Sequence, residues 1–98
     1  MPKINEEVEF ELDLDKPSMY KVILHNDDYT TMEFVVMILT NIFHKSTEES
    51  EKIMWNIHEK GKGVCGVYTY EIAQTKVEQV LELAKDNEFP LLATMEEE

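Results

Sequence analysis

The chain contains no arginine. All nine of its basic residues are lysines, they stand against 21 aspartates and glutamates, and the formal net charge is −12. The planar guanidinium of arginine grips phosphate through two parallel hydrogen bonds, and an acidic surface repels polyanions. We therefore expect the protein to bind neither nucleic acid nor an anionic membrane surface, and to favour cationic partners instead.

Cysteine and long apolar runs are equally scarce. A single residue, Cys65, cannot form an internal disulfide, which suits a reducing compartment. The sequence has no run of about 18 apolar residues that would span a membrane. Its N-terminus lacks the basic start and following apolar stretch of a secretory signal. These absences predict a cytoplasmic protein.

Glycine and proline are few as well, with three of each, so most of the chain is available for regular elements. The 98 residues, 43% of them hydrophobic, suffice for one modest core. Apolar periodicity predicts strands over 20–25 and 64–69 and a short strand from Leu91, with the first strand apolar enough to be covered on both faces. It predicts helices from 30 or 31 to 43, from the capping-box pair Ser46 and Glu49 to Lys60, and over 72–85.

This order, β-α-α-β-α-β, predicts an α+β fold: a two-layer single domain with a three-stranded, mainly antiparallel sheet packed on three helices.

The start of the chain differs from the rest, because "EEVEFELDLD" carries six carboxylates in ten positions. Its apolar residues alternate as in a strand, but adjacent like charges oppose compaction. We expect residues 1–16 to form a flexible acidic arm and residues 17–98 to form the domain.

The stretch "HNDDYTTM" follows the first predicted strand and opens the first predicted helix. One explanation is structural, because Asn26, Asp27, Asp28 or Thr30 could cap that helix by accepting its free N–H groups. The other is functional. Amide and carboxylate oxygens gathered at a strand end form an acceptor-rich group, whose natural guest is a cation with several N–H donors, such as an ammonium.

Other residues with reactive or ligating side chains are isolated. Met54 and His58 lie four apart on the second predicted helix, so they share a face that could line a pocket with a polar tip. Cys65 stands in the middle of a predicted strand, where a buried packing role is expected. No pair of histidines or cysteines has a recognised metal-ligand spacing. The residues therefore favour neither an enzyme nor a cofactor site, and they support a metal site only weakly.

Three stretches together resemble one known family. "NDDYTTM", "HEKGKGVCGVYT" and "EIAQTK" are similar to motifs of the ClpS family, adaptors of the bacterial N-degron pathway. The similarity runs from about Pro17 to the end of the chain without an evident insertion. It implies a protein that binds substrates whose free N-terminal residue is large and apolar (Phe, Tyr, Trp or Leu) and delivers them to a ClpA- or ClpC-type AAA+ unfoldase of the Clp protease.

The resemblance also implies roles for single residues. The free α-amino group would be held by Asn26, Asp27 and His58. The side-chain pocket would be lined by Thr30, Met32, Val35, Met54, Ile57 and Leu91. The unfoldase would contact Glu71 and Lys76, and the acidic arm would aid delivery. The chain departs from many relatives at Thr31, where they have proline, and at His25, where they often have asparagine.

The leading hypothesis is thus a monomeric, non-catalytic peptide-binding adaptor. Two alternatives from other classes stay open. One is a metal-binding or metal-dependent hydrolytic domain built on His25, Asp27, Asp28 and His58. The other is a purely structural, oligomerising domain similar to the small ribosomal stalk module.

Overall fold

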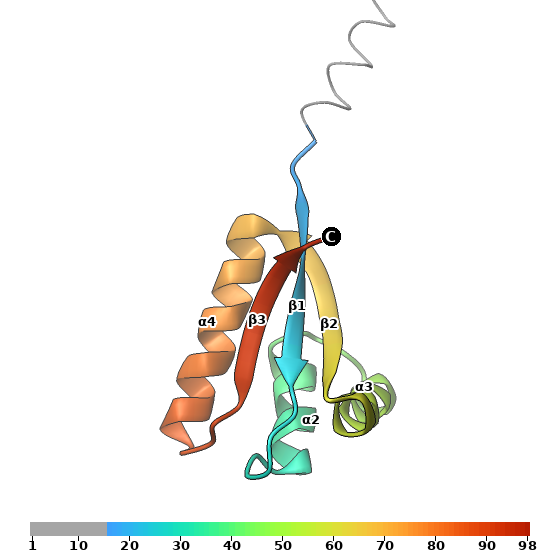
Figure 1. The fold of residues 1–98 in the computed structure, drawn as a ribbon, viewed down its shortest axis with the longest axis vertical. Coiled ribbons are helices and arrows are strands. Elements are labelled where there is room, and N and C mark those ends of the chain that lie inside the picture. Colours follow the sequence, from blue (N-terminus) through green and yellow to red (C-terminus); the bar gives the residue numbers. More distant parts are fainter. Residues whose placement is uncertain (1–15) are drawn as a thin grey trace, which may run out of the picture.

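The computed structural model describes residues 16–98, so nearly all of the predicted acidic arm, residues 1–16, lies outside the described residues. The elements follow the predicted order: β1 (Met19–His25), α2 (Met32–Asn41), α3 (Thr47–Lys60), β2 (Lys62–Thr69), α4 (Tyr70–Asp86) and β3 (Leu92–Glu97). They form the predicted α+β domain with one three-stranded sheet (Figure 1). No helix within residues 16–98 is long and apolar enough to cross a membrane.

The first strand lies in the middle of the sheet. The strand order is β2-β1-β3, and β1 pairs antiparallel with both neighbours. The register between β1 and β2 shifts between Val22 and Ile23, because β2 carries one extra residue there: Val22 pairs with Gly66, but Ile23 pairs with Val64. The residue left over is Cys65, which is almost completely buried at 1% exposure. A bulge of this kind increases the local twist of the sheet.

The core lies between the sheet and its helices. From β1, Val22 and Leu24 point into it, as alternation along a strand requires, and both are fully buried. The helices contribute Ile38 and Leu39 from α2 and Val80 from α4, also fully buried. The remaining core residues are Phe34, Val35, Ile42, Phe43, Met54, Ile57, Cys65, Ala73, Ala84, Leu91 and Ala93.

The other face of the sheet carries no helix among residues 16–98, as Figure 1 shows. The prediction that the first strand is covered on both faces is confirmed for the middle of the strand, where Val22, Ile23 and Leu24 are all buried, although no helix packs flat on this face. Ile23 points to this open face and is only 4% exposed; around it lie residues of the neighbouring strands and Asn56 of α3. Val64 and Leu92, which lie on the same face, remain about half exposed.

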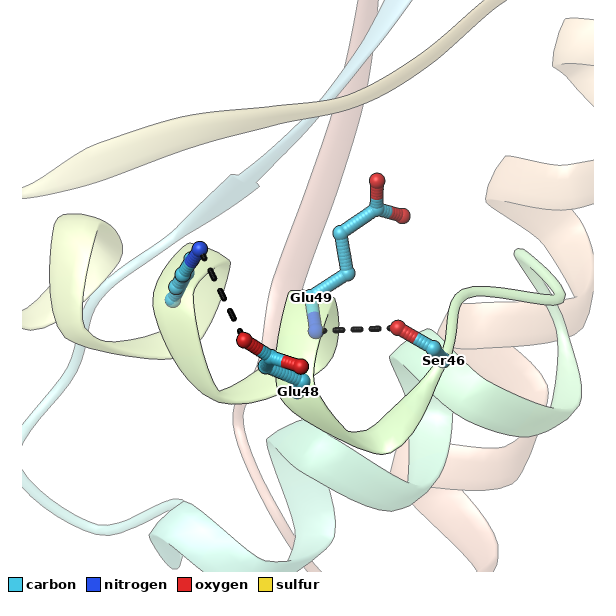
Figure 2. Close-up of polar contacts among 4 residues, drawn as sticks. Ser46, Glu48 and Glu49 are labelled. Atoms are coloured by element: carbon cyan, nitrogen blue, oxygen red, sulfur yellow. Dashed lines mark hydrogen bonds and ion pairs between the residues drawn. The ribbon is translucent and has the colours of Figure 1, made fainter.

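Helix α3 starts and ends close to the predicted residues. The Ser46 hydroxyl accepts a hydrogen bond from the backbone N–H of Glu49 at 3.1 Å, but the Glu49 carboxylate points away from Ser46 (Figure 2). The predicted capping box is thus only half formed. An ion pair between Glu48 and Lys52 at 4.0 Å lies on the same helix. Gly61 ends the helix with φ of +89°, a conformation that costs glycine little.

The two other helices end on residues other than glycine. His44 follows α2 with φ of +55°, and Glu88 follows α4 with φ of +61°. The next N–H groups reach back to close each helix, from Lys45 to the Leu39 carbonyl at 3.1 Å and from Phe89 to the Ala84 carbonyl at 2.8 Å. This is the arrangement usually built with glycine. Helix α2 ends at Asn41, two residues before the predicted end, and α4 begins at Tyr70, two residues before the predicted start.

Candidate functional site

The loop between β1 and α2 forms one wall of a cavity, and α3 forms the other. The cavity measures about 440 Å³ and is lined by Asn26, Asp27, Asp28, Tyr29, Thr30, Thr31, Met32, Val35, Met54, Ile57 and His58. All three residues expected at the α-amino group are among them, as are five of the six expected in the side-chain pocket. The stretch "HNDDYTTM" and the Met54–His58 face, far apart in the sequence, therefore meet in one place.

Asp27 organises the loop. Its Oδ1 accepts hydrogen bonds from the backbone N–H groups of Tyr29 at 2.8 Å and Thr30 at 2.7 Å, and its Oδ2 accepts one from the Thr30 hydroxyl at 2.7 Å. Partial burial alone would raise the pKa of this carboxyl, but the hydrogen bonds from Thr30 and Tyr29 outweigh it and lower the pKa below 3.8. Asp27 is therefore a stable carboxylate whose charge lies at the cavity wall.

Capping of α2 falls to a residue that we did not expect. Thr31 is the N-cap: it has extended backbone angles, and its side chain accepts from the Phe34 N–H at 3.2 Å. The prediction that Asn26, Asp27, Asp28 or Thr30 caps this helix is wrong. Asp27 instead closes the preceding turn, as aspartate side chains commonly do. Because Thr31 caps α2, the side-chain oxygens of the residues before Thr31 are not needed as caps.

Several polar groups at the cavity remain available. Within residues 16–98 the side chains of Asn26 and Asp28 make no hydrogen bond or ion pair, and His58 makes only a ring contact, edge-on to Trp55 with centroids 5.8 Å apart. A carboxylate has about four acceptor positions, so Asp27 keeps one after its three bonds. The Asn26 N–H donates to the Gly61 carbonyl at 2.8 Å and joins the loop to the end of α3.

The interior of the cavity is apolar. Val35, Met54 and Ile57 are less than 10% exposed, whereas Met32 is 40% exposed. Gly63 lets α3 sit close to β2, because a Cβ there would lie 2.8 Å from Ile57 Cγ1. Leu91, the sixth residue expected in this pocket, does not line the cavity. It is 4% exposed and belongs to the core cluster, packed there just before β3 begins.

The structure does not bring together the four residues of the metal alternative. His25 lies on β1, and its Nε2 is 2.7 Å from the Thr94 hydroxyl of β3, away from the cavity lining. Among residues 16–98, no three histidine, cysteine, aspartate or glutamate side chains lie close enough together to hold a metal ion. A nucleophilic role for Cys65 has no support either, because burial raises the pKa of its thiol to about 12.

The two residues expected at the unfoldase differ in their surroundings. Glu71 is exposed in the first turn of α4. Lys76 is half-buried, donates from Nζ to the Ile42 carbonyl at 2.6 Å, and lies 5.8 Å from the centre of the Tyr68 ring.

A second hollow, of about 540 Å³, lies beside Lys76. It is lined mainly by polar and charged side chains (Asn41, Ile42, His44, Lys76, Gln79, Glu82, Leu83 and Asp86). The cavity of about 440 Å³ is the better candidate site, because it joins an apolar interior to free hydrogen-bond acceptors.

Sequence reasoning missed three parts of this region. Tyr29 and Thr31 line the cavity although no role was expected of them there. Their only sequence signal was their position inside the loop. Trp55, half exposed beside His58, was overlooked entirely. A tryptophan one position from the buried Met54 could have been recognised as a surface aromatic at the rim of a site.

The arrangement can bind a molecule that has an ammonium group next to a large apolar side chain. Free carboxylate and amide oxygens and an imidazole can accept from the three donors of an ammonium. The buried apolar residues beyond them can take a side chain of aromatic or leucine size. A blocked or internal peptide nitrogen offers at most one donor and no charge, so the same group would bind it weakly.

Comparisons with known proteins give a consistent family. The family profile described as ATP-dependent Clp protease adaptor protein ClpS matches residues 15–94. The chain is 56% identical over 90 residues to the ATP-dependent Clp protease adapter protein ClpS of Syntrophus aciditrophicus (strain SB), covering 92% of this chain and 84% of that protein. It is 57% identical over 90 residues to the protein of the same name from Acetivibrio thermocellus, covering 92% and 91%.

A solved structure is similar as well. Agrobacterium tumefaciens ClpS2, solved bound to L-phenylalaninamide, superimposes with a TM-score of 0.82 at 40% sequence identity. The match covers 85% of this chain and all of the other.

Proposed function

The chain belongs to the ClpS family of ATP-dependent Clp protease adaptors, which makes it an adaptor and not an enzyme, and from this premise we propose that it binds substrates through a free N-terminal Phe, Tyr, Trp or Leu. The observation that supports this most directly is the cavity that joins free acceptor groups to an apolar interior. Asn26, Asp27 and His58 hold the α-ammonium, and Met32, Val35, Met54 and Ile57 surround the side chain, with Thr30 at the loop wall.

The ligand of the similar structure fits this assignment. L-phenylalaninamide has an α-ammonium, a benzyl side chain and an uncharged amide where a peptide chain would continue, so it imitates the first residue of a protein. Burying a Phe or Leu side chain contributes about 1.5–3 kcal/mol, and each hydrogen bond to the charged group adds about 1.5–3 kcal/mol. After the cost of association, these gains are consistent with binding on the order of micromolar.

The binding test compares two peptides that differ only at the nitrogen. Fluorescence anisotropy is measured with a peptide beginning with Phe and with its acetyl-Phe form, with and without a chelator. We expect the free amine to bind at least tenfold more tightly, and the chelator to have no effect. Equal affinity for both peptides, or no binding to either, would refute the proposed site. Loss of binding with chelator would restore the metal alternative.

Delivery is the second part of the proposal. We infer that the adaptor acts as a monomer in the cytoplasm and hands its substrate to a ClpA- or ClpC-type unfoldase. Glu71 is the accessible contact residue. Lys76 presents less of its charge, because its ammonium already binds within the domain.

Deleting residues 1–16 tests the role assigned to the acidic arm. The shortened chain should keep its affinity for the Phe peptide and lose degradation of that substrate by the unfoldase and protease. A parallel loss of affinity and degradation would contradict an arm that acts in delivery alone.

A further inference from the structure

One face of the three-stranded sheet has no helix packed flat on it within residues 16–98 (Figure 1). Apolar side chains of all three strands lie on this face, which we call the open sheet face: Met19 and Ile23 from β1, Val64 and Val67 from β2, and Leu92 from β3. Ile23 is buried in the middle, whereas the other four are 37–49% exposed. Half-exposed apolar side chains gathered around a buried one are typical of an interaction surface.

The open sheet face is basic, although the chain as a whole is strongly acidic. Alternation along the strands places Lys21, Lys62 and Glu96 on this face, beside the titratable His25. Two lysines against one glutamate give a charge of +1, whereas the whole chain carries −12. Lys21 pairs with Glu96 at 3.5 Å, and Lys62 is exposed and forms no ion pair within residues 16–98. The face therefore suits an occupant that is both apolar and acidic.

The acidic arm of the same chain has this chemistry. Residues 1–15 contain six carboxylates and one lysine. Within them the stretch "VEFELDL", residues 8–14, alternates acidic side chains with four apolar ones, Val8, Phe10, Leu12 and Leu14.

The arm is long enough to reach all of this face. It joins the domain at Lys16, three positions before β1 begins. Fifteen residues can extend about 50 Å, roughly twice the length of about 23 Å expected for the seven residues of β1. Residues 16–18 lead away from the sheet (Figure 1), so the arm reaches the face by bending back there. Pro17 and Ser18 are residue types common in turns.

We propose that the open sheet face binds residues 1–15 of its own chain. The apolar side chains of the arm cover the half-exposed patch, and its carboxylates pair with Lys62 and compete with Glu96 for Lys21. The long stem of a lysine allows its charge to reach past an apolar neighbour. The arm is then held on the domain and must detach before it acts in delivery. The contact itself does not depend on substrate binding at the cavity.

The test places a spin label on the arm of the full chain. Glu7→Cys provides an accessible thiol just before the alternating stretch, and a nitroxide reagent spares Cys65, which is only 1% exposed. The nitroxide should broaden the amide NMR signals of the open sheet face, and these signals should return when it is reduced. The signal of Leu81 on α4, which packs against the other face of the sheet, should keep its intensity. Higher salt should weaken the broadening, because exposed charge pairs are screened.

Variants of the spin-labelled chain locate the contact. The double change Phe10→Ser with Leu12→Ser removes apolar side chains from the arm alone and should abolish the selective broadening. Lys62→Gln should weaken it. Lys85→Gln removes the same charge from an exposed position in the last turn of α4, so it is the matched control and should leave the broadening unchanged.

Two results would overturn the proposal. One is broadening that is absent, or that is equal on both faces of the sheet. The other comes from a mixture of isotope-labelled chains without nitroxide and spin-labelled chains without isotope: broadening there would mean that the face binds the arm of a second copy. No substrate peptide enters these measurements. The proposal can therefore fail while peptide binding at the cavity stands, and the reverse also holds.

Discussion

Replacing Asp27 by asparagine separates the two roles that the structure gives to this residue. The carboxylate holds the loop through three hydrogen bonds and places a negative charge at the cavity. In the Asp27→Asn variant, the amide oxygen can still accept from the N–H groups of Tyr29 and Thr30, and the amide nitrogen can donate to the Thr30 hydroxyl. The loop therefore keeps its shape while the charge disappears.

The expected losses differ between two substitutions. Losing the charge-assisted contact should weaken peptide binding about tenfold, equivalent to about 1.4 kcal/mol, near the lower end for a hydrogen bond to a charged group because the site is open to water. The Asp27→Asn variant should keep its Tm. Asp27→Ala removes all three loop bonds as well and should lower the free energy of unfolding by about 1–2 kcal/mol, or the Tm by roughly 5–10 °C.

Anisotropy with peptides beginning with Phe and with Leu measures the first effect, and thermal unfolding followed by circular dichroism measures the second. Both peptides should lose affinity by a similar factor, because both present the same ammonium. If Asp27→Asn bound as tightly as the unchanged protein, the carboxylate would serve only to hold the loop. Very unequal losses for Phe and Leu would show that Asp27 acts on the side-chain pocket instead.

Three further predictions concern stability. The hydrogen bonds to Asp27 keep the pKa of its carboxyl below 3.8 in the folded protein, so its stabilisation is full above about pH 4 and disappears as the pH falls through the folded pKa. Acid titrations should show the stability advantage over Asp27→Ala shrinking below that pH, and a constant difference would contradict this. Glu88→Gly should raise the free energy of unfolding by about 0.5 kcal/mol. The left-handed φ of +61° costs a residue with a side chain about 1–2 kcal/mol, and the greater freedom of glycine in the unfolded chain offsets part of the gain. Glu88→Ala is the control in the same thermal scan and should bring no gain. Lys76→Met should lower the free energy of unfolding by about 1 kcal/mol, because it removes the hydrogen bond to the Ile42 carbonyl. Glu71→Gln should leave denaturant unfolding unchanged, and equal stability of the two variants would refute the internal role of Lys76.

The sequence predicted the order of elements well because each helix and strand carries its own apolar pattern. Its errors arise where distant residues decide the outcome. Leu91 belongs to the core cluster and is not among the residues that line the cavity, a packing that no local pattern records. Ile23 is buried although no helix packs flat on its face of the sheet, and the residues around it include Asn56, 33 positions further along the chain. The carbonyl that accepts from Lys76 lies 34 residues away in the sequence.

In the candidate site, too, local sequence patterns predicted some features, whereas others depend on residues that meet only in the folded protein. Local composition marked the loop as acceptor-rich, and helix spacing placed Met54 and His58 on one face. Neither could show that Thr31 would take over the capping of α2, or that Asp27 would use three of its acceptor positions inside the loop. Which polar groups remain free depends on the three-dimensional hydrogen-bond pattern. Thus the site's residue types were predictable, whereas the division of tasks among them was not.

The central position of β1 has a consequence for how the chain folds. Tyr20 pairs with Glu97, 77 residues further along the chain, so the second edge of β1 has no partner until residues 92–97 have been synthesised. Pairings this distant close late and slowly, and an unpaired strand edge invites association with other chains. Truncation of even a few C-terminal residues should therefore reduce the yield of folded adaptor made by the ribosome, although β3 contributes nothing to the cavity lining.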